Sequence, residues 1–342
     1  MSKVKIPYGE SDFKTLREEN YVYVDKTMYI EKLETYKRAI YLRPRRFGKS
    51  LFTSMISYYY DINEKENFEK LYKDLYIYDH PTEKKNSYYI LKFNFSGMSI
   101  DIQDGPEVIK EEFKQNVLVG CDKFVNKYNL NIELKRELSA AQILRNLLLE
   151  FQKKRKANKI YIIIDEYDHF TNGMLEGNVS RFINSLGQGG FVRAFYEVIK
   201  EYAEGQDSVI DRFFGTGVAP LTLDSLTSGF NIAENLSTNK NFVAMNGLTE
   251  KEVKDLIKKC GLEEIVYEEL KKNYDGFRFS IKNDEHTFNV TLVMYYLKHY
   301  VEKGKPPKNP IDRNLSTTGN KIDAIAMYAS YFTSRIDKKR SI

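Results

Sequence analysis

The chain has 342 residues, of which 42% are hydrophobic and 30% charged, and its formal net charge is +5. This composition is ordinary for a globular protein and excludes a wholly disordered chain, and so small a charge does not by itself indicate a nucleic-acid partner. The two cysteines exclude a disulfide framework and a zinc site built from several cysteines. A chain of this length suits one large α/β domain or a core with an appendage.

Targeting and membrane signals are missing from the sequence. The first residues, MSKVKIPYGESDF, contain no apolar run of the kind found in signal peptides, and no stretch approaches the roughly 18 apolar residues of a membrane span. Cys121 and Cys260 each lie in an apolar helical stripe, where a cysteine is a small buried hydrophobe. We therefore expect a soluble protein without membrane contact in a reducing compartment, the cytoplasm.

Short runs of β-branched and aromatic residues alternate with longer amphipathic stretches over most of the chain, which predicts βα units and a mostly parallel sheet. The predicted strands are 39–43, 89–95, 160–165 and 212–216, with a weaker fifth around 242–245. From about residue 248 the pattern changes to short helices, the first of which begins with a capping box of Thr249 and Glu252. We expect an α/β core at 1–245, a small helical lid at 246–300 and a linker or tail at 301–342.

Residues 39–50, AIYLRPRRFGKS, read as a strand, a loop that ends in Gly-Lys-Ser, and the start of an amphipathic helix. This order favours phosphate binding, because backbone N–H groups and the helix dipole at a helix start attract anions. Lys49 would reach the β- and γ-phosphates and the Ser50 hydroxyl would ligate Mg²⁺. The alternative is a chance tripeptide with solvated loop charges. We call residues 43–50 the P-loop segment, and the nucleotide-binding residues expected in and after it are Arg45, Arg46, Phe47, Gly48, Lys49, Ser50 and Leu51.

One position departs from the pattern G-x-x-x-x-G-K-[ST], because Arg43 stands where the first glycine is expected. The loop must then turn without the positive φ that glycine permits, and Pro44 fixes one φ angle instead.

The run YIIIDE at 161–166 predicts a buried strand that ends in two acids. In a P-loop ATPase, Asp165 would belong to the Mg²⁺ shell and Glu166 would act as the general base toward the attacking water. A solvated turn or half of another metal site are the alternatives. The order of the motifs, with another strand between them, favours the ATPase branch that has an added strand and a catalytic glutamate.

A third candidate is Thr216, at the end of the strand in DRFFGTGVAP and between Gly215 and Gly217. We expect it to be a polar sensor of the γ-phosphate or the attacking water; the alternative is a threonine in a glycine-rich turn.

With these motifs in place, the chain resembles the AAA-ATPase-like family of bacterial proteins, many of which are fused to a C-terminal PD-(D/E)XK nuclease-like domain. The matching stretches include DFKTLREENYVYVDKTMYIEKL, LRPRRFGKSLFTSMISYYY, IIIDEYDHF, GTGVAPLTLDSLTSGFNIAENLS and YDGFRFS. The resemblance implies a P-loop NTPase core with strand order 5-1-4-3-2, nucleotide at the strand carboxyl ends, and tolerance of the missing first glycine. We expect no nuclease site within these residues.

The YDGFRFS stretch supplies the last candidate, Arg278, which could contact nucleotide from the lid or form a structural salt bridge. The expected function is Mg²⁺-dependent ATP binding and hydrolysis that drives a conformational switch. The expected partners are ATP, a nuclease-like domain or partner protein, DNA or RNA, and further copies of the chain. A nucleotide-binding regulatory or scaffold module that does not hydrolyse ATP is the alternative function; Glu166 favours hydrolysis, because a pure binder does not need it.

Overall fold

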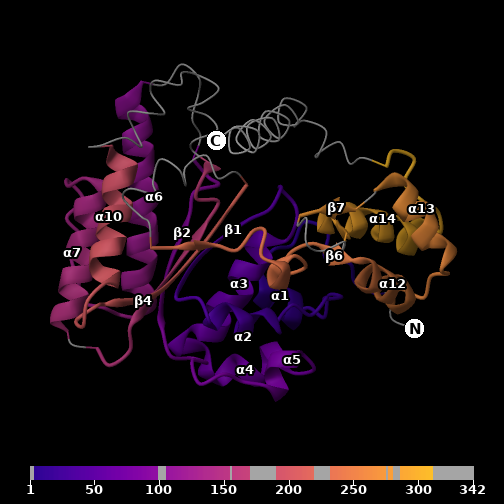
Figure 1. The fold of residues 1–342 in the computed structure, drawn as a ribbon, viewed down its shortest axis with the longest axis horizontal. Helices are drawn as coiled ribbons and strands as arrows, with labels where there is room; N and C mark the ends of the chain where they lie inside the picture. Colours follow the sequence, from indigo (N-terminus) through magenta and orange to yellow (C-terminus); the bar gives the residue numbers. More distant parts are fainter. Residues whose placement is uncertain are drawn as a thin grey trace, which may run out of the picture.

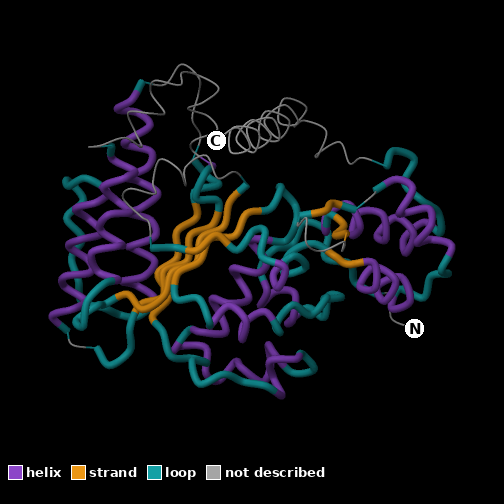
Figure 2. The backbone as a smooth tube through the Cα atoms, in the orientation of Figure 1, coloured by secondary structure: helices purple, strands orange, loops and turns teal. Residues whose placement is uncertain are grey.

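The central feature of the fold is a five-stranded parallel sheet, seen in orange in the middle of Figure 2. The computed structural model describes residues 4–98, 105–154, 156–169, 190–218, 232–274, 276–279 and 286–310. The strands are β1 (Arg38–Leu42), β2 (Tyr89–Asn94), β3 (Ile160–Asp165), β4 (Ile210–Gly217) and β5 (Glu234–Asn235), in the order β2-β3-β4-β1-β5. Read from β5, this is the predicted order 5-1-4-3-2, and the predicted α/β fold is confirmed.

The position of the fifth strand was predicted wrongly. The edge strand is β5 at 234–235, whereas the run Phe242–Met245 begins at the last residue of a 3₁₀ helix, η2 (Lys240–Phe242). Asn239 caps that turn by accepting a hydrogen bond from the Asn241 N–H, and the Met245 N–H donates a hydrogen bond to the Phe242 carbonyl. All four residues of the run are buried, and a short buried apolar run has the same pattern in a turn as in a strand.

Helices cover both faces of the sheet (Figure 1). One face packs on α6 (Pro106–Lys127), α7 (Ala140–Lys153) and α10 (Phe191–Ala203), and these helices share a hydrophobic core with alternate strand residues such as Ile162. The other face packs on α3 (Lys49–Tyr60) and its neighbours, with residues such as Ile163. Neighbouring residues of β3 therefore enter different cores, as the pleat of a strand requires. The remaining elements beside α3 are α1 (Phe13–Glu18), α2 (Tyr29–Glu34), η1 (Ile62–Asn67), α4 (Phe68–Tyr72) and α5 (Tyr76–Asp79).

Residues 246–300, which we call the C-terminal segment, pack around a third hydrophobic core of their own that also takes in Ile6. Their elements are β6 (Leu248–Thr249), α12 (Glu250–Lys259), α13 (Ile265–Asn273), β7 (Phe277–Arg278), β8 (His286–Phe288) and most of α14 (Val290–Lys303). The predicted capping box of α12 is present, but the segment is not purely helical, because its three short strands form an antiparallel sheet in the order β6-β8-β7. Strands of two or three residues are too short to show an alternating pattern in the sequence.

The C-terminal segment lies beside α1 and α3, on the far side of the sheet from α6, α7 and α10 (Figure 1). Most of the predicted tail, residues 311–342, lies outside the described residues. Within the described residues, none of the helices combines the length and the apolar character needed to cross a lipid bilayer.

Candidate nucleotide-binding site

The P-loop segment connects the end of β1 to the start of α3. Within it Arg46 (φ 70°) and Gly48 (φ 87°) adopt the left-handed conformation, and Gly48 is the N-cap of α3. Alternating right- and left-handed residues turn successive N–H groups toward one side and form a concave nest for an anion. The loop therefore has positive φ angles of the kind found in anion nests, and it lies at the positive end of a helix.

Arg43, at the position of the missing first glycine, points into the protein. Its side chain is 2% exposed and donates to the carbonyl oxygens of Leu42 (2.8 Å), Ser237 (2.8 Å) and Val243 (3.2 Å). Its guanidinium also lies over the ring of Phe279, 4.1 Å from the centroid. Because Arg43 has no positive φ, this backbone position does not need a glycine. The arginine joins the end of β1 to the 237–243 segment.

Lys49 is buried at the first position of α3 and its side chain folds back over the loop. Its Nζ donates to the carbonyl oxygens of Arg43 (3.0 Å) and Pro44 (3.1 Å), and the residue is 4% exposed. Burial lowers the pKa of Lys49, and the negative charges of Glu166, Asp168 and Asp165 oppose that shift. The lysine thus lies within electrostatic reach of all three carboxylates.

The carboxylates lie at the end of β3 or just after it, and β4 runs parallel beside that strand. Asp165 ends β3 and is buried, and the hydroxyl of buried Thr216 donates to its Oδ1 over 2.6 Å. The carboxylate of Asp168 accepts the N–H of Val218 over 2.9 Å and so fixes the chain after β4. At Gly217, an added Cβ would lie 2.5 Å from an Asp168 oxygen, so a side chain cannot fit there. The structure therefore brings Thr216 together with Asp165; the role of Thr216 as a sensor stays a prediction.

Glu166 follows directly after the sheet with φ 52°, a conformation that few residues other than glycine adopt. Its side chain is 20% exposed, and its Oε2 lies 3.2 Å from Nδ1 of His169. This hydrogen bond lowers the pKa of Glu166 against the effect of burial, with help from the charges of Lys49 and Arg45. The carboxyl group is therefore ionised at neutral pH.

The same nitrogen of His169 also lies 3.4 Å from Nη2 of Arg45. A ring nitrogen with a proton donates to Glu166, and one without a proton accepts from Arg45, so the two contacts exclude each other. His169 thus connects the P-loop segment to the residue expected to be the base.

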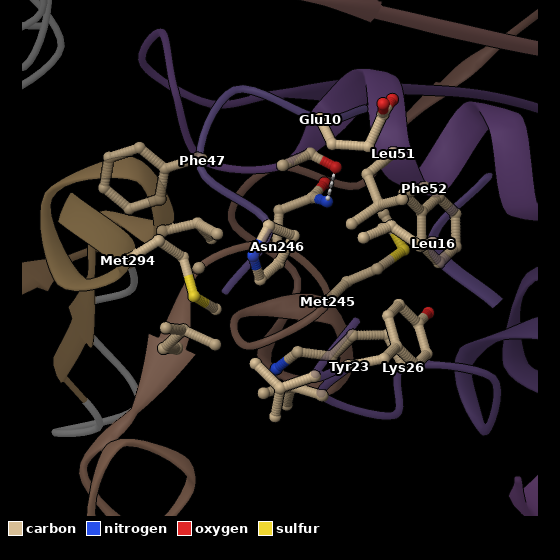
Figure 3. Close-up of a pocket in the computed structure, with 17 residues that line it drawn as sticks. Glu10, Leu16, Tyr23, Lys26, Phe47, Leu51, Phe52, Met245, Asn246 and Met294 are labelled. Atoms are coloured by element: carbon tan, nitrogen blue, oxygen red, sulfur yellow. Dashed lines mark hydrogen bonds between the residues drawn. The ribbon is translucent and has the colours of Figure 1, made fainter. Parts of the chain in front are cut away.

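A pocket lies next to the P-loop segment, where the first turn of α3 meets the C-terminal segment and the N-terminal residues (Figure 3). Its cavity volume is about 60 Å³, and the pocket is partly open to solvent. Gly48 and Leu51 line it from α3 and the loop before it, and Val290 and Met294 line it from α14. Most of the wall is apolar, which suits a flat, weakly polar group.

Comparison with known proteins identifies the family. A family model described as "Predicted AAA-ATPase" matches residues 7–227, which include the P-loop segment, Asp165 and Thr216. The chain belongs to this family. The resemblance that the motifs indicated is confirmed, although the family's name itself describes the ATPase activity as predicted.

One relative of this AAA-ATPase-like chain is an "Uncharacterized protein in vnfD 5'region" of Azotobacter chroococcum mcd 1, 26% identical over 316 residues. The match covers 90% of this chain but 55% of the relative, so the chain spans about half the length of the curated relative that it matches. Since only about a tenth of this chain lies outside the match, the match includes the C-terminal segment. That segment lies beyond the residues that the family model matches.

The C-terminal segment of the AAA-ATPase-like chain contributes to the site in a way that the sequence analysis missed. The expected contact was Arg278, but the side chains that reach the P-loop segment are its neighbours Phe277 and Phe279, whose rings lie 5.2 and 5.4 Å from that of Phe47. Successive side chains of a strand point to opposite faces, so the Arg278 side chain leaves β7 on the other face. A contact between Arg278 and nucleotide stays a prediction.

Two asparagines, Asn246 and Asn289, also contact the loop and were not identified from the sequence. Asn246 donates to the carbonyl of Gly48 (3.1 Å), a bond drawn in Figure 3, and Asn289 donates to that of Arg45 (3.2 Å). The available signals were the Asn-Gly pair at 246–247 and the position of Asn289 before a helix, and both are typical of ordinary turns and caps.

Proposed function

We propose that this chain binds Mg²⁺·ATP at the P-loop segment and hydrolyses it to ADP and phosphate. The proposal is supported above all by the convergence of Lys49 with Asp165, Glu166 and Asp168 beside a loop with the backbone shape of an anion nest. A lysine and two acids from neighbouring elements are the groups that phosphoryl transfer to water requires.

The phosphates would lie against the N–H groups of the loop. Lys49 would exchange its bonds to the carbonyls of Arg43 and Pro44 for bonds to phosphate oxygens, and this exchange costs little because its charge stays compensated. Arg45, half-buried next to His169, would add a second cation near the γ-phosphate. Arg46 presents its backbone to the nest, and its side chain is exposed.

The Ser50 hydroxyl and the Asp165 carboxylate would hold the Mg²⁺ that accompanies ATP. Thr216 orients Asp165 through Oδ1, and the other carboxylate oxygen, Oδ2, would serve as the ligand. The described residues contain no group of three or more His, Cys, Asp or Glu that could hold a metal. Magnesium bound with a nucleotide needs one or two protein oxygens besides phosphates and water, and when bound it neutralises charge on the phosphates.

Glu166 would take the proton of the attacking water. Its lowered pKa keeps it ionised at neutral pH, and its position one residue beyond Asp165 places it at the same edge of the sheet. Glu166 contacts His169 through Oε2, which would hold the carboxylate in place, and the other oxygen, Oε1, would accept the proton.

The purine base would occupy the apolar pocket beside Gly48 and Leu51 (Figure 3). A base stacked against Val290 and Met294 would touch the C-terminal segment as well as α3, so nucleotide binding would join the two parts of the chain. Closure of this kind is a common way to turn binding into a conformational change. A nuclease-like domain, another protein, nucleic acid or a second copy of the chain could respond to that change.

A second candidate function is that of a nucleotide-dependent module that hydrolyses ATP slowly or not at all. The contact between Glu166 and His169 favours it, because it engages the carboxylate that would act as the base. Steady-state ATP turnover of the whole chain separates the two, measured with Mg²⁺ and with EDTA, and with and without added nucleic acid. Turnover that requires Mg²⁺ and is lost in Glu166→Gln supports the ATPase. Tight ATP binding without turnover under all these conditions supports the module, and absence of binding contradicts both.

A further inference from the structure

Four successive carbonyl groups of the P-loop segment accept hydrogen bonds from the C-terminal segment. Two donors are side-chain amides and two are backbone N–H groups, and all four lie about 200 residues or more from their acceptors in the sequence. The bonds are Asn289 Nδ2 to Arg45 (3.2 Å), Thr291 N to Arg46 (3.3 Å), Gly247 N to Phe47 (2.9 Å) and Asn246 Nδ2 to Gly48 (3.1 Å).

These bonds act on the backbone geometry that phosphate binding needs. In a nest the N–H groups point to one side, so the carbonyls between them point to the other. Holding the carbonyls at 45–48 from outside therefore fixes the direction of the N–H groups inside. The left-handed conformation of Arg46 is unfavourable for a residue with a side chain, and it persists only where its surroundings hold it.

Phe47 adds an apolar anchor to the four hydrogen bonds. It is 0% exposed and packs edge-on against the rings of Phe277 and Phe279. Gly247 makes this packing possible, because a Cβ there would lie 3.0 Å from the Phe47 ring and its φ is 88°. On the outer side of the loop, the Phe47 side chain is therefore packed as tightly as a residue of the hydrophobic core.

Asn289 has two separable functions. Its Oδ1 accepts the N–H groups of Thr291 (3.0 Å) and Leu292 (3.2 Å) and so caps α14, while its Nδ2 donates to Arg45. Serine is as good an N-cap as asparagine but has no amide to donate. The substitution Asn289→Ser therefore keeps the cap, adds no charge and removes the bond to the loop.

We propose that Asn246 and Asn289 are positioning residues that hold the P-loop segment in its phosphate-binding shape, so that the C-terminal segment sets the affinity of the site for phosphate groups. The consequence for affinity rests on the proposed nucleotide function, whereas the consequence for loop structure does not. Two measurements on the full chain separate them: hydrogen exchange of the 43–50 amides without nucleotide, and calorimetric binding of Mg²⁺·ADP.

The control is Asn239→Ser, the same substitution at another cap. Asn239 accepts the N–H of Asn241 and donates to the Tyr36 hydroxyl (3.1 Å), so the control also loses an amide bond, but to a group outside the P-loop segment. Asn289→Ser should speed exchange of the loop amides severalfold and weaken Mg²⁺·ADP binding about fivefold, the factor expected for one ordinary hydrogen bond. Asn239→Ser should change neither, and both variants should lose little melting temperature.

Unchanged loop exchange in Asn289→Ser would overturn the proposal, and so would equal effects in both variants or faster exchange throughout the chain. If the wild-type chain binds no Mg²⁺·ADP, the nucleotide function fails and the exchange comparison still decides the role of the asparagines. If Asn289→Ser does not fold, Asn246→Ser decides in its place: it removes the bond to Gly48 and no cap.

Discussion

The P-loop segment has two sides that differ in chemistry. The side toward the carboxyl ends of the strands carries charges, among them Lys49 and Glu166, which lie within electrostatic reach of each other. The side toward the C-terminal segment carries neutral amides and aromatic rings, such as Asn289 and Phe277. Charges are suited to binding and reacting with phosphates, and neutral donors can fix a backbone without attracting ions. Under the proposed function, the charged side would perform the chemistry and the neutral side would hold the shape of the loop.

The largest effect is expected for Arg43, the buried arginine whose hydrogen bonds hold the start of the P-loop segment. Arg43→Gly would restore the usual glycine of the motif, yet it removes three hydrogen bonds of a buried guanidinium and its contact with Phe279. We expect a loss of about 3 kcal/mol in the free energy of unfolding, measured in urea. Arg46→Gly is the matched control, because Arg46 is exposed with φ 70° and glycine suits that conformation. Equal stability of the two variants would show that Arg43 is not a structural residue.

The next effect tests the charged side. Glu166→Gln keeps the size of the side chain but removes the base, so ATP turnover should fall by roughly 10²-fold or more while nucleotide affinity holds. Turnover should be measured under steady-state conditions and affinity by calorimetry. If turnover survives within about a factor of two, the catalytic assignment of Glu166 is wrong.

A smaller effect is expected for Lys49→Ala, which removes the ammonium group from the loop. Binding of ATP should weaken at least tenfold, or about 1.4 kcal/mol, in calorimetric titrations. Because Lys49 Nζ also bonds two carbonyls of the loop, the melting temperature without nucleotide should be recorded alongside. An unchanged affinity would contradict the assignment of the P-loop segment.

The smallest effect concerns Arg278, on the face of β7 away from Phe47. Arg278→Lys keeps the charge but loses bidentate contact with a phosphate. If Arg278 senses the γ-phosphate of its own or a neighbouring chain, turnover should fall more than ADP binding weakens. A lower melting temperature with normal turnover per folded molecule would make it a structural residue instead.

The fold could be predicted where the sequence carries local patterns. The buried run before Asp165 and the Gly-Lys-Ser loop after β1 are local patterns, and the structure has both strands in the predicted order. The strand expected around Phe242 was wrong because its apolar pattern also fits the buried turn capped by Asn239.

The candidate site was predicted only in part, because the residues that hold the outer side of its loop are distant in the sequence. Arg45 and Asn289 are 244 positions apart, and nothing in a single sequence connects an N-cap with a loop at that separation. The YDGFRFS stretch drew attention to its arginine, since arginines bind phosphates, whereas the two phenylalanines make the contact with Phe47. The alternation of side chains along a strand places the arginine and the two phenylalanines on opposite faces of β7. This rule could not be applied from the sequence, because the sequence did not identify β7 as a strand.

The distance along the chain between the loop and its supports has a consequence for synthesis. A ribosome makes the P-loop segment before the residues that hold its carbonyls, which follow about 200 residues later at Asn246 and Gly247 and about 240 residues later at Asn289 and Thr291. At the usual translation rate of roughly 5–20 residues per second, the outer side of the loop stays exposed to water for on the order of ten seconds or more. The nascent chain therefore has the motif long before it has the site, and tight nucleotide binding would first arise when α14 has left the exit tunnel and docked.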